Sequence, residues 1–206
     1  RYYPAPKYWE DLLNTQLYET KADRDLRALY RLIYDTKTMN KPEEYSEAAS
    51  MLMTGGFPGE AKRVLEQGVA AGVFAGEALT RAQGELQRAR SGADADAKDL
   101  PSADKALAAA KTGNEMVATG KLYFSVGDYA KAADAIRKGL AKGGVTDVDD
   151  ANVLLGIAEV RAGKGTESYP AFDAIKDAKL KEVAGLWKLY VETTTSPQPA
   201  TPAPAA

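Results

Sequence analysis

The strongest structural signal in the chain is the stretch GKLYFSVGDYAKAADAIRKG, residues 120–139. Apolar residues recur at helical spacing on both sides of Gly127-Asp128, a dipeptide that is typical of a turn. The small residues Gly120 and Ala132 occupy the positions at which a second helix would touch the first. The stretch therefore predicts an antiparallel helical hairpin whose two helices approach closely.

The rest of the chain shows the same helical periodicity. Alanine, leucine, lysine and glutamate dominate, and no segment alternates apolar and polar residues as a half-buried strand would. We expect an all-α chain of about 10–11 helices, packed as antiparallel pairs and joined by short turns that carry Gly, Asp or Pro. After an opening hairpin within 5–37, the expected helices run over 43–55, 59–71, 76–91, 102–111, 114–126, 129–141, 149–162, 167–176 and 180–192.

Two segments differ from this pattern. Residues 91–104, SGADADAKDLPSAD, are polar and acidic and contain a proline, which predicts a loop or a frayed helix end. Residues 193–206, TTTSPQPATPAPAA, have no core-forming side chain, so we expect a polyproline-like, mobile tail. A stiff segment of this kind loses little conformational entropy when it binds. We hypothesise that it occupies a concave binding groove, either on its own chain or on a neighbouring molecule.

Composition excludes several classes of function. The 206 residues are 45% hydrophobic and 27% charged with a formal net charge of −2, which is typical of a folded globular chain and unlike the basic excess of nucleic-acid binders. No run approaches the roughly 18 apolar residues of a membrane span. The chain has no cysteine and no histidine, which excludes zinc sites built on them, thiol nucleophiles and Ser-His-Asp triads. We expect no metal, no cofactor, no nucleic-acid partner and no direct membrane insertion.

The chain begins with Arg1 rather than Met. We therefore expect a fragment or a processed form, and any signal peptide would lie upstream of this sequence.

A repeat emerges when residue 113 is taken as the first position of a 34-residue unit. Gly120 then falls at position 8, Tyr123 at 11, Ala132 at 20, Ile136 at 24 and Gly139 at 27. Small residues at 8 and 20 let the two helices of a hairpin approach, and large residues at 11 and 24 fill the contact. This spacing resembles the tetratricopeptide repeat, in which small residues occupy positions near 8, 20 and 27 and large residues occupy positions near 11, 17 and 24.

A second copy begins near residue 149, with Gly156 at position 8 and Phe172 at position 24. It departs from the pattern at position 11, which is Glu159, and at position 20, which is Ser168. Pro170 also lies early in its second helix.

A weaker third copy starts at Pro42, with Ala49 at position 8, Leu52 at 11, Ala61 at 20, Leu65 at 24 and Gly68 at 27. The resemblance thus implies one repeat domain over 1–192. It would consist of a degenerate opening hairpin at 5–37, repeats near 42–75, 113–146 and 149–180, and a closing helix at 180–192.

The resemblance also implies a right-handed α-solenoid in which the first helix of each hairpin lines a concave groove, through positions 2, 5, 9, 12 and 13. On the best copy these are Asn114, Val117, Lys121, Phe124 and Ser125; on the copy from 149 they are Asp150, Val153, Ile157, Val160 and Arg161; on the copy from 42 they include Ser50 and Met53. Apolar pockets beside Lys121 and Arg161 would hold an extended peptide through charge-assisted hydrogen bonds. The alternative for each position is packing between consecutive helices.

The predicted function is therefore a non-catalytic scaffold that binds a protein or peptide partner. The stretches PKYWEDLL, GFPGEAKRVLEQG and LGIAEVRAGK are similar to exported tetratricopeptide proteins of the proteobacterial cell envelope, which implies a periplasmic or otherwise exported location and leaves the cytoplasm open. Two alternatives remain. One is a structural or oligomerising module that self-associates through its tyrosine-rich N-terminus. The other is an enzyme or small-ligand receptor, which would need a deep pocket with converging groups.

Other motifs favour structural interpretations. Asp94, Asp96 and Asp99 fail the calcium-loop pattern because Lys98 and Lys105 stand where ligands are required, so a solvated acidic loop is expected. Gly163-Lys164-Gly165-Thr166 lacks the upstream glycine and the strand of a phosphate-binding loop, so it predicts a turn. The pairs Glu43-Glu44 and Asp149-Asp150 stand where helices should begin, where negative charge favours the free N–H groups.

Overall fold

The computed structural model describes residues 6–195, which form α-helices and one 3-10 helix and contain no strand. The elements are α1 (Pro6–Glu19), α2 (Asp23–Asp35), α3 (Pro42–Thr54), α4 (Pro58–Ala70), α5 (Gly76–Ala109), α6 (Gly113–Val126), α7 (Tyr129–Lys142), α8 (Val148–Arg161), η1 (Gly165–Ser168), α9 (Tyr169–Asp173) and α10 (Ala178–Thr195). The expectation of an all-α chain of paired helices is confirmed. Residues 1–5 and 196–206 lie outside the described residues, and residues 193–195 of the expected tail are the helical end of α10 instead.

The hairpin of α6 and α7 has the close contact that its sequence predicts. A Cβ atom on Gly120 would lie 2.5 Å from Cγ1 of Ile136 and 3.3 Å from the carbonyl oxygen of Ala132. Gly127 ends α6 with a positive φ of 93°, which favours glycine, and the Asp128 carboxylate accepts a hydrogen bond from the N–H of Lys131. Small residues at the contact therefore set how closely these two helices pack.

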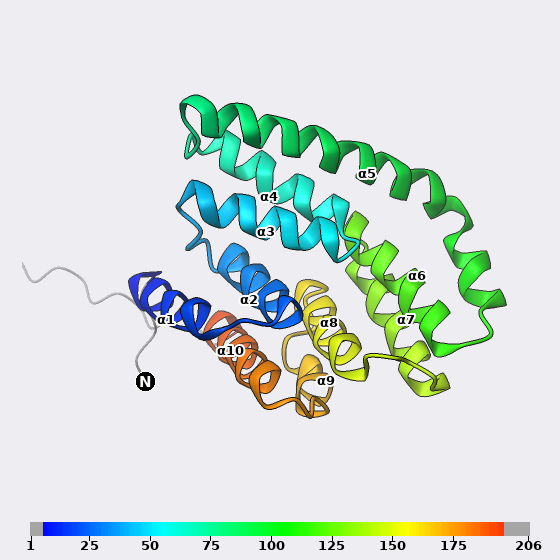
Figure 1. Cartoon of the computed structure of the whole chain (residues 1–206). Coiled ribbons are helices and arrows are strands. Elements are labelled where there is room, and N and C mark those ends of the chain that lie inside the picture. The colour runs from blue at the N-terminus through cyan, green and yellow to red at the C-terminus, as the bar shows by residue number, and fades with distance from the viewer. Residues whose placement is uncertain (1–5, 196–206) are drawn as a thin grey trace, which may run out of the picture.

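Segment 91–104 is helical, so the expectation of a loop there is wrong. It forms the middle of α5, a 34-residue helix that contains Pro101 and curves along the outside of the molecule (Figure 1). Packing against α6 explains the difference: Ala103 is buried, and the Asp96 carboxylate accepts a hydrogen bond of 2.6 Å from Ser125 Oγ. These tertiary contacts outweigh the local preference of proline and aspartate for a turn.

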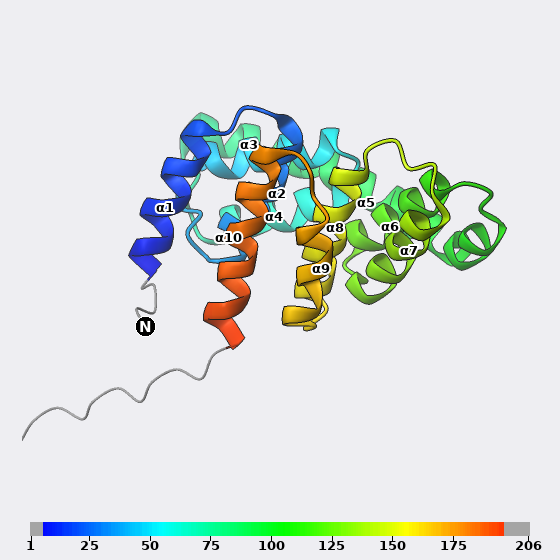
Figure 2. The same ribbon diagram turned by 90° about the horizontal axis from the view of Figure 1, so that it is seen from below.

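Consecutive helices pack as adjacent pairs (Figures 1 and 2). In addition, α8 and α10, which are late in the chain, pack against α2, which is early in the chain. Helix α10 packs on α2, where the indole Nε1 of Trp187 donates a hydrogen bond of 3.1 Å to the carbonyl oxygen of Ala28. Both residues are fully buried, and α8 also contacts α2. The helices thus surround a common centre instead of leaving one side of the array open.

The second half of the copy from 149 is shorter than expected. The predicted helix over 167–176 is divided into the 3-10 helix η1 and the five-residue helix α9. Within residues 6–195, no helix combines the length and the apolar character that crossing a membrane requires.

Candidate functional site

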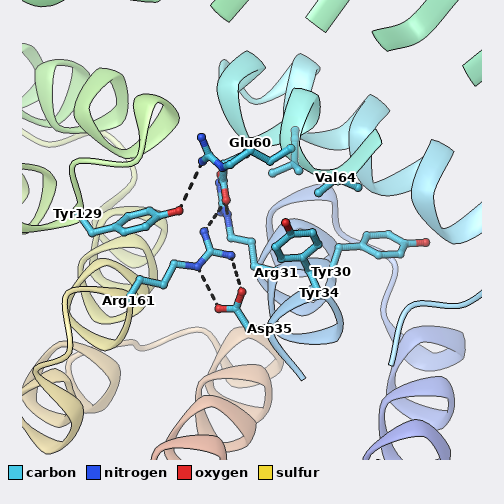
Figure 3. Close-up of a pocket in the computed structure, with 10 residues that line it drawn as sticks. Tyr30, Arg31, Tyr34, Asp35, Glu60, Val64, Tyr129 and Arg161 are labelled. Atoms are coloured by element: carbon cyan, nitrogen blue, oxygen red, sulfur yellow. Dashed lines mark hydrogen bonds and ion pairs between the residues drawn. The ribbon is translucent and has the colours of Figure 1, made fainter. Parts of the chain in front are cut away.

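A buried network of charged side chains joins α2, α4 and α8 at the centre of the molecule (Figure 3). Glu60 on α4 accepts from Nη2 of Arg31 on α2 at 2.6 Å and from Nη1 of Arg161 on α8 at 2.6 Å. Arg161 also donates through Nε to the carboxylate of Asp35 at 3.0 Å. The network balances two arginines with two carboxylates, so each buried charge has a partner.

Aromatic rings surround the two arginines of the network. The Arg31 guanidinium carbon lies 4.3 Å from the ring centroid of Phe57 and 4.9 Å from that of Phe124. The Arg161 guanidinium carbon lies 5.4 Å from the rings of Phe124 and Tyr129. At these distances a guanidinium is attracted to the face of a ring.

The surroundings of Glu60 and Arg161 favour the charged form of each side chain. Burial alone would raise the pKa of Glu60, but the adjacent Arg31 and Arg161 guanidiniums outweigh it and hold the pKa below its ordinary value. Burial would likewise lower the pKa of Arg161, but Asp35 and Glu60 raise it well above the ordinary value. Both shifts favour the charged forms of Glu60 and Arg161.

A cavity of about 180 Å³, which we call the mouth, opens beside this network. The mouth is lined by Tyr30, Arg31, Tyr34, Asp35, Leu52, Glu60, Arg63, Val64, Tyr129 and Arg161. Its lining includes three arginines and only two carboxylates, and the third arginine is Arg63. The mouth therefore has an excess of positive charge.

Arg63 is the arginine of the mouth that has no carboxylate partner within the described residues. Its Nη1 donates to the carbonyl oxygen of Ser125 at 3.0 Å, and its Nη2 lies 3.4 Å from the hydroxyl of Tyr129. Tyr34 lies on the other side of the Arg161 guanidinium from Tyr129 (Figure 3). Burial raises the pKa of Tyr34, although Arg63 and Arg161 oppose the shift, so its hydroxyl is a neutral donor. The mouth thus presents several donors for an anionic group.

No family model, no curated protein and no solved structure significantly matches this chain.

Helix α2 lies against several of the residues that the sequence predicts for a partner. Asp150 forms ion pairs with Lys121 at 3.0 Å and with Arg27 of α2 at 3.5 Å. Phe124 lies under Arg31 of α2, and Arg161 binds Asp35 of α2. In this arrangement the chain's own second helix makes the charge-assisted contacts that were expected of a bound peptide.

The structure brings together only part of the predicted groove. Phe124, Ser125 and Arg161 reach the centre, whereas Asn114 is exposed and bonds to Thr146 instead. Ser50 and Met53 line a separate cavity of about 150 Å³ between α3 and α5. The remaining predicted positions, Val117, Val153, Ile157 and Val160, are buried or half-buried apolar residues.

Sequence reasoning missed Arg31, Asp35, Glu60 and Arg63. In DRDLRALYRLIYD, residues 23–35, the charges at 24, 27, 31 and 35 follow one face of the helix, opposite the apolar Leu29. Such a face is usually solvated, and nothing local shows that it meets α4 and α8. The charged stripe was visible in the sequence, but its burial was not.

The other motifs have structural roles. Glu44 closes a capping box at the start of α3, and Asp149 and Asp150 lie in the first turn of α8, as predicted. Asp149 also accepts hydrogen bonds from the N–H groups of Lys176 and Asp177. In the described part of the chain, no group of three acidic side chains is placed to hold a metal ion. Of residues 163–166, the first two lie in the turn after α8, and Gly165 and Thr166 begin the 3-10 helix η1.

Proposed function

We propose that this chain is a non-catalytic protein-interaction module, a closed variant of a tetratricopeptide-like solenoid, that binds an acidic side chain of a protein partner at the mouth. The size of the mouth supports this proposal. Sites for small molecules usually measure about 300–1,000 Å³, whereas the mouth measures about 180 Å³. A cavity of that size accommodates one side chain of a larger partner whose remaining surface contacts the surrounding helices.

The charge of the mouth supports an acidic side chain. The network neutralises Arg31 and Arg161, and Arg63 supplies the remaining positive charge. Its guanidinium has N–H donors beyond the two that it uses, and the Tyr34 hydroxyl makes no hydrogen bond within residues 6–195. A carboxylate would satisfy both groups through charge-assisted hydrogen bonds.

The state of Glu60 supports binding over catalysis. Its two oxygens accept hydrogen bonds from two arginines, and its pKa lies below the ordinary value. A general base works best when its pKa is near the operating pH and its oxygen is free to take a proton. Glu60 meets neither condition.

The test is the binding of fluorescent peptides that are matched in length and carry acidic, neutral or basic residues. We expect the acidic peptides to bind, and the variant Arg63→Gln to weaken them by about tenfold or more. Arg90→Gln is the matched control, because Arg90 is an exposed arginine on α5 that pairs with Glu66. Equal binding of the three peptide classes, or acidic-peptide binding that Arg63→Gln leaves unchanged, would contradict the proposal.

A second candidate function is self-association through α1 and α10. These helices lie side by side, with Trp9 and Tyr190 in edge-to-face contact at 6.2 Å. Tyr8 and Leu12 on α1 and Leu189 on α10 are exposed apolar residues. Analytical ultracentrifugation of the native chain and of Leu12→Asp tests it: a dimer that the substitution dissociates supports this function, and a monomer at all concentrations opposes it. A role in a bacterial envelope assembly is part of the same proposal and depends on the sequence resemblance.

A further inference from the structure

A second cavity, of about 550 Å³, lies between α8 and the segment of η1 and α9. It shares no lining residue with the mouth. We call it the α8–α9 cavity. Its size is within the range of about 300–1,000 Å³ that is usual for small-molecule sites.

The sequence explains why this cavity exists. Position 11 of the best repeat is Tyr123, which is 1% exposed and fills the contact between α6 and α7. The equivalent residue on α8 is Glu159, and the segment opposite it is a 3-10 turn followed by a five-residue helix. A shorter, polar side chain and a shorter second helix leave space where the other hairpin is filled.

Two polar side chains in the lining of this cavity lack partners. Asn152 is 6% exposed, and its side-chain amide makes no hydrogen bond within residues 6–195. Glu159 is 4% exposed; one carboxylate oxygen accepts from Arg137, and the other is buried without a partner among the described residues. Each unsatisfied polar group costs about 1–3 kcal/mol, so native proteins retain few of them. The buried oxygen of Glu159, together with the unused amide of Asn152 in the same cavity, points to a ligand that supplies hydrogen bonds.

The arrangement of charge indicates what kind of ligand fits. Asn152 offers one acceptor and an NH₂ donor, and the free oxygen of Glu159 needs a donor. Lys164 lines the same cavity and forms no ion pair within the described part of the chain. The cavity therefore offers acceptors for an ammonium group and donors for a carboxylate. Leu155 and Pro170 supply an apolar wall.

We propose that the α8–α9 cavity binds a free α-amino acid with an aliphatic side chain. Its ammonium group is held by Glu159 and the Asn152 oxygen, its carboxylate by the Asn152 NH₂ and Lys164, and its side chain packs on Leu155 and Pro170. The electrostatics of Glu159 agree with this assignment. Burial raises the pKa of Glu159, and the nearby negative charge of Glu167 raises it further. Arg137 and Lys164 oppose this shift. A bound ammonium would offset the cost of burying the charged form.

Isothermal titration calorimetry with L-leucine, L-valine and L-methionine tests the proposal on the full chain. Two half-ligands separate the contributions: 3-methylbutylamine lacks the carboxylate, and 4-methylpentanoate lacks the amine. We expect at least one of the amino acids to bind with a Kd below about 1 mM, and each half-ligand to bind at least about tenfold more weakly than L-leucine. Failure of all three amino acids to bind, or equal binding of L-leucine and a half-ligand, would overturn the proposal.

Variants test the site itself. Glu159→Gln keeps the shape of the side chain and removes the charge, and we expect it to weaken amino-acid binding by about tenfold or more. Glu85→Gln is the matched control, because Glu85 also has a buried, unpartnered oxygen but lies in the cavity between α3 and α5. Binding that Glu159→Gln leaves unchanged in a folded protein would reject the site. Arg63→Gln should leave amino-acid binding unchanged, so this result is independent of the function proposed for the mouth.

Discussion

Two buried polar regions lie on either side of α8 and differ in how fully their groups are paired. On one side, Arg161 belongs to a network in which Arg31, Glu60 and Asp35 all have partners. On the other side, two residues earlier, Glu159 keeps an oxygen without a partner and lies near an unpaired amide. The paired region connects helices that are far apart in the sequence. The unpaired region has hydrogen-bonding capacity left for a ligand.

This difference begins in the contacts between paired helices. In the hairpin of α6 and α7, Gly120 lies against Ile136, and Tyr123 and Ile136 are buried. In the hairpin of α8 and α9, Gly156 still packs against Phe172, but position 11 is Glu159. A polar residue at this position and a divided second helix together accompany a cavity where the other hairpin is packed.

Removing the centre of the paired region should have the largest effect. Glu60→Ala leaves Arg31 buried without its carboxylate and removes one partner of Arg161. We expect a loss of about 4 kcal/mol in the free energy of unfolding, measured by urea denaturation. Glu66→Ala, which removes an exposed partner of Arg90, is the control and should cost less than about 1 kcal/mol. A similar loss in both variants would contradict the central role of the network.

The two helix contacts should respond differently to an added methyl group. Gly120→Ala meets the Ile136 side chain at 2.5 Å and backbone atoms at 3.3 Å, so we expect a cost of about 2–3 kcal/mol. The three atoms nearest to a new Cβ at Gly156 all belong to the ring of Phe172, and because the short helix α9 that carries this ring can shift, we expect Gly156→Ala to cost about 1 kcal/mol less. Gly84→Ala, where the new Cβ meets no atom within 4 Å, should stabilise α5 by about 0.5–1 kcal/mol. Thermal unfolding of the three variants checks this order, and equal costs at Gly120 and Gly156 would oppose it.

Removing the Glu159 carboxylate, of which one oxygen has no partner in the described part of the chain, should cost little or nothing. Glu159→Met replaces a buried oxygen that lacks a partner with an apolar group, so we expect a change between zero and a gain of about 1 kcal/mol. The same urea experiment measures it. A loss of more than about 1 kcal/mol would show that the pair of Glu159 and Arg137 stabilises the fold in the way the central network does.

The two carboxylates should also have opposite pH dependences. The pKa of Glu60 is lowered in the folded state, so its contribution to stability is present above the unfolded pKa and is lost as the pH falls through the folded pKa. The pKa of Glu159 is raised, so its contribution is present below the unfolded pKa and is lost as the pH rises through the folded pKa. The destabilisation caused by Glu60→Gln should therefore shrink on acidification, and any gain from Glu159→Gln should grow as the pH rises. Denaturation of the wild type and the two variants from pH 3 to 7 measures both slopes, and slopes of the same sign would contradict this assignment.

Features that depend on near neighbours were predictable from the sequence. The spacing of Gly120, Ala132 and Ile136 predicts the α6–α7 contact because the two helices are joined by a short turn. The departures at Glu159 and Ser168 lie in the hairpin whose second helix is divided, although a continuous helix over 167–176 was predicted there. In contrast, the continuity of α5 through Pro101 depends on contacts with α6, and local propensity alone predicts a break there.

The candidate site was only partly predictable, because its contacts join distant parts of the chain. Phe124 and Arg161 were expected to face a partner, and both lie at the centre of the molecule. The groups that meet them come from α2 and α4, and Asp35 lies 126 residues from Arg161 in the sequence. The periodicity of a single hairpin does not predict which distant helix packs against Phe124 and Arg161.

The hydrogen bond from Trp187 to Ala28 has a further consequence for how this fold can change. An open repeat array can gain or lose a unit at either end and still stack. Here α10 and α8 must return to α2, so one additional hairpin between α4 and α8 would displace Arg161 from Asp35 and Trp187 from Ala28. The closure therefore fixes the number of helices, and evolution by repeat duplication would have to break these contacts before it could lengthen the molecule.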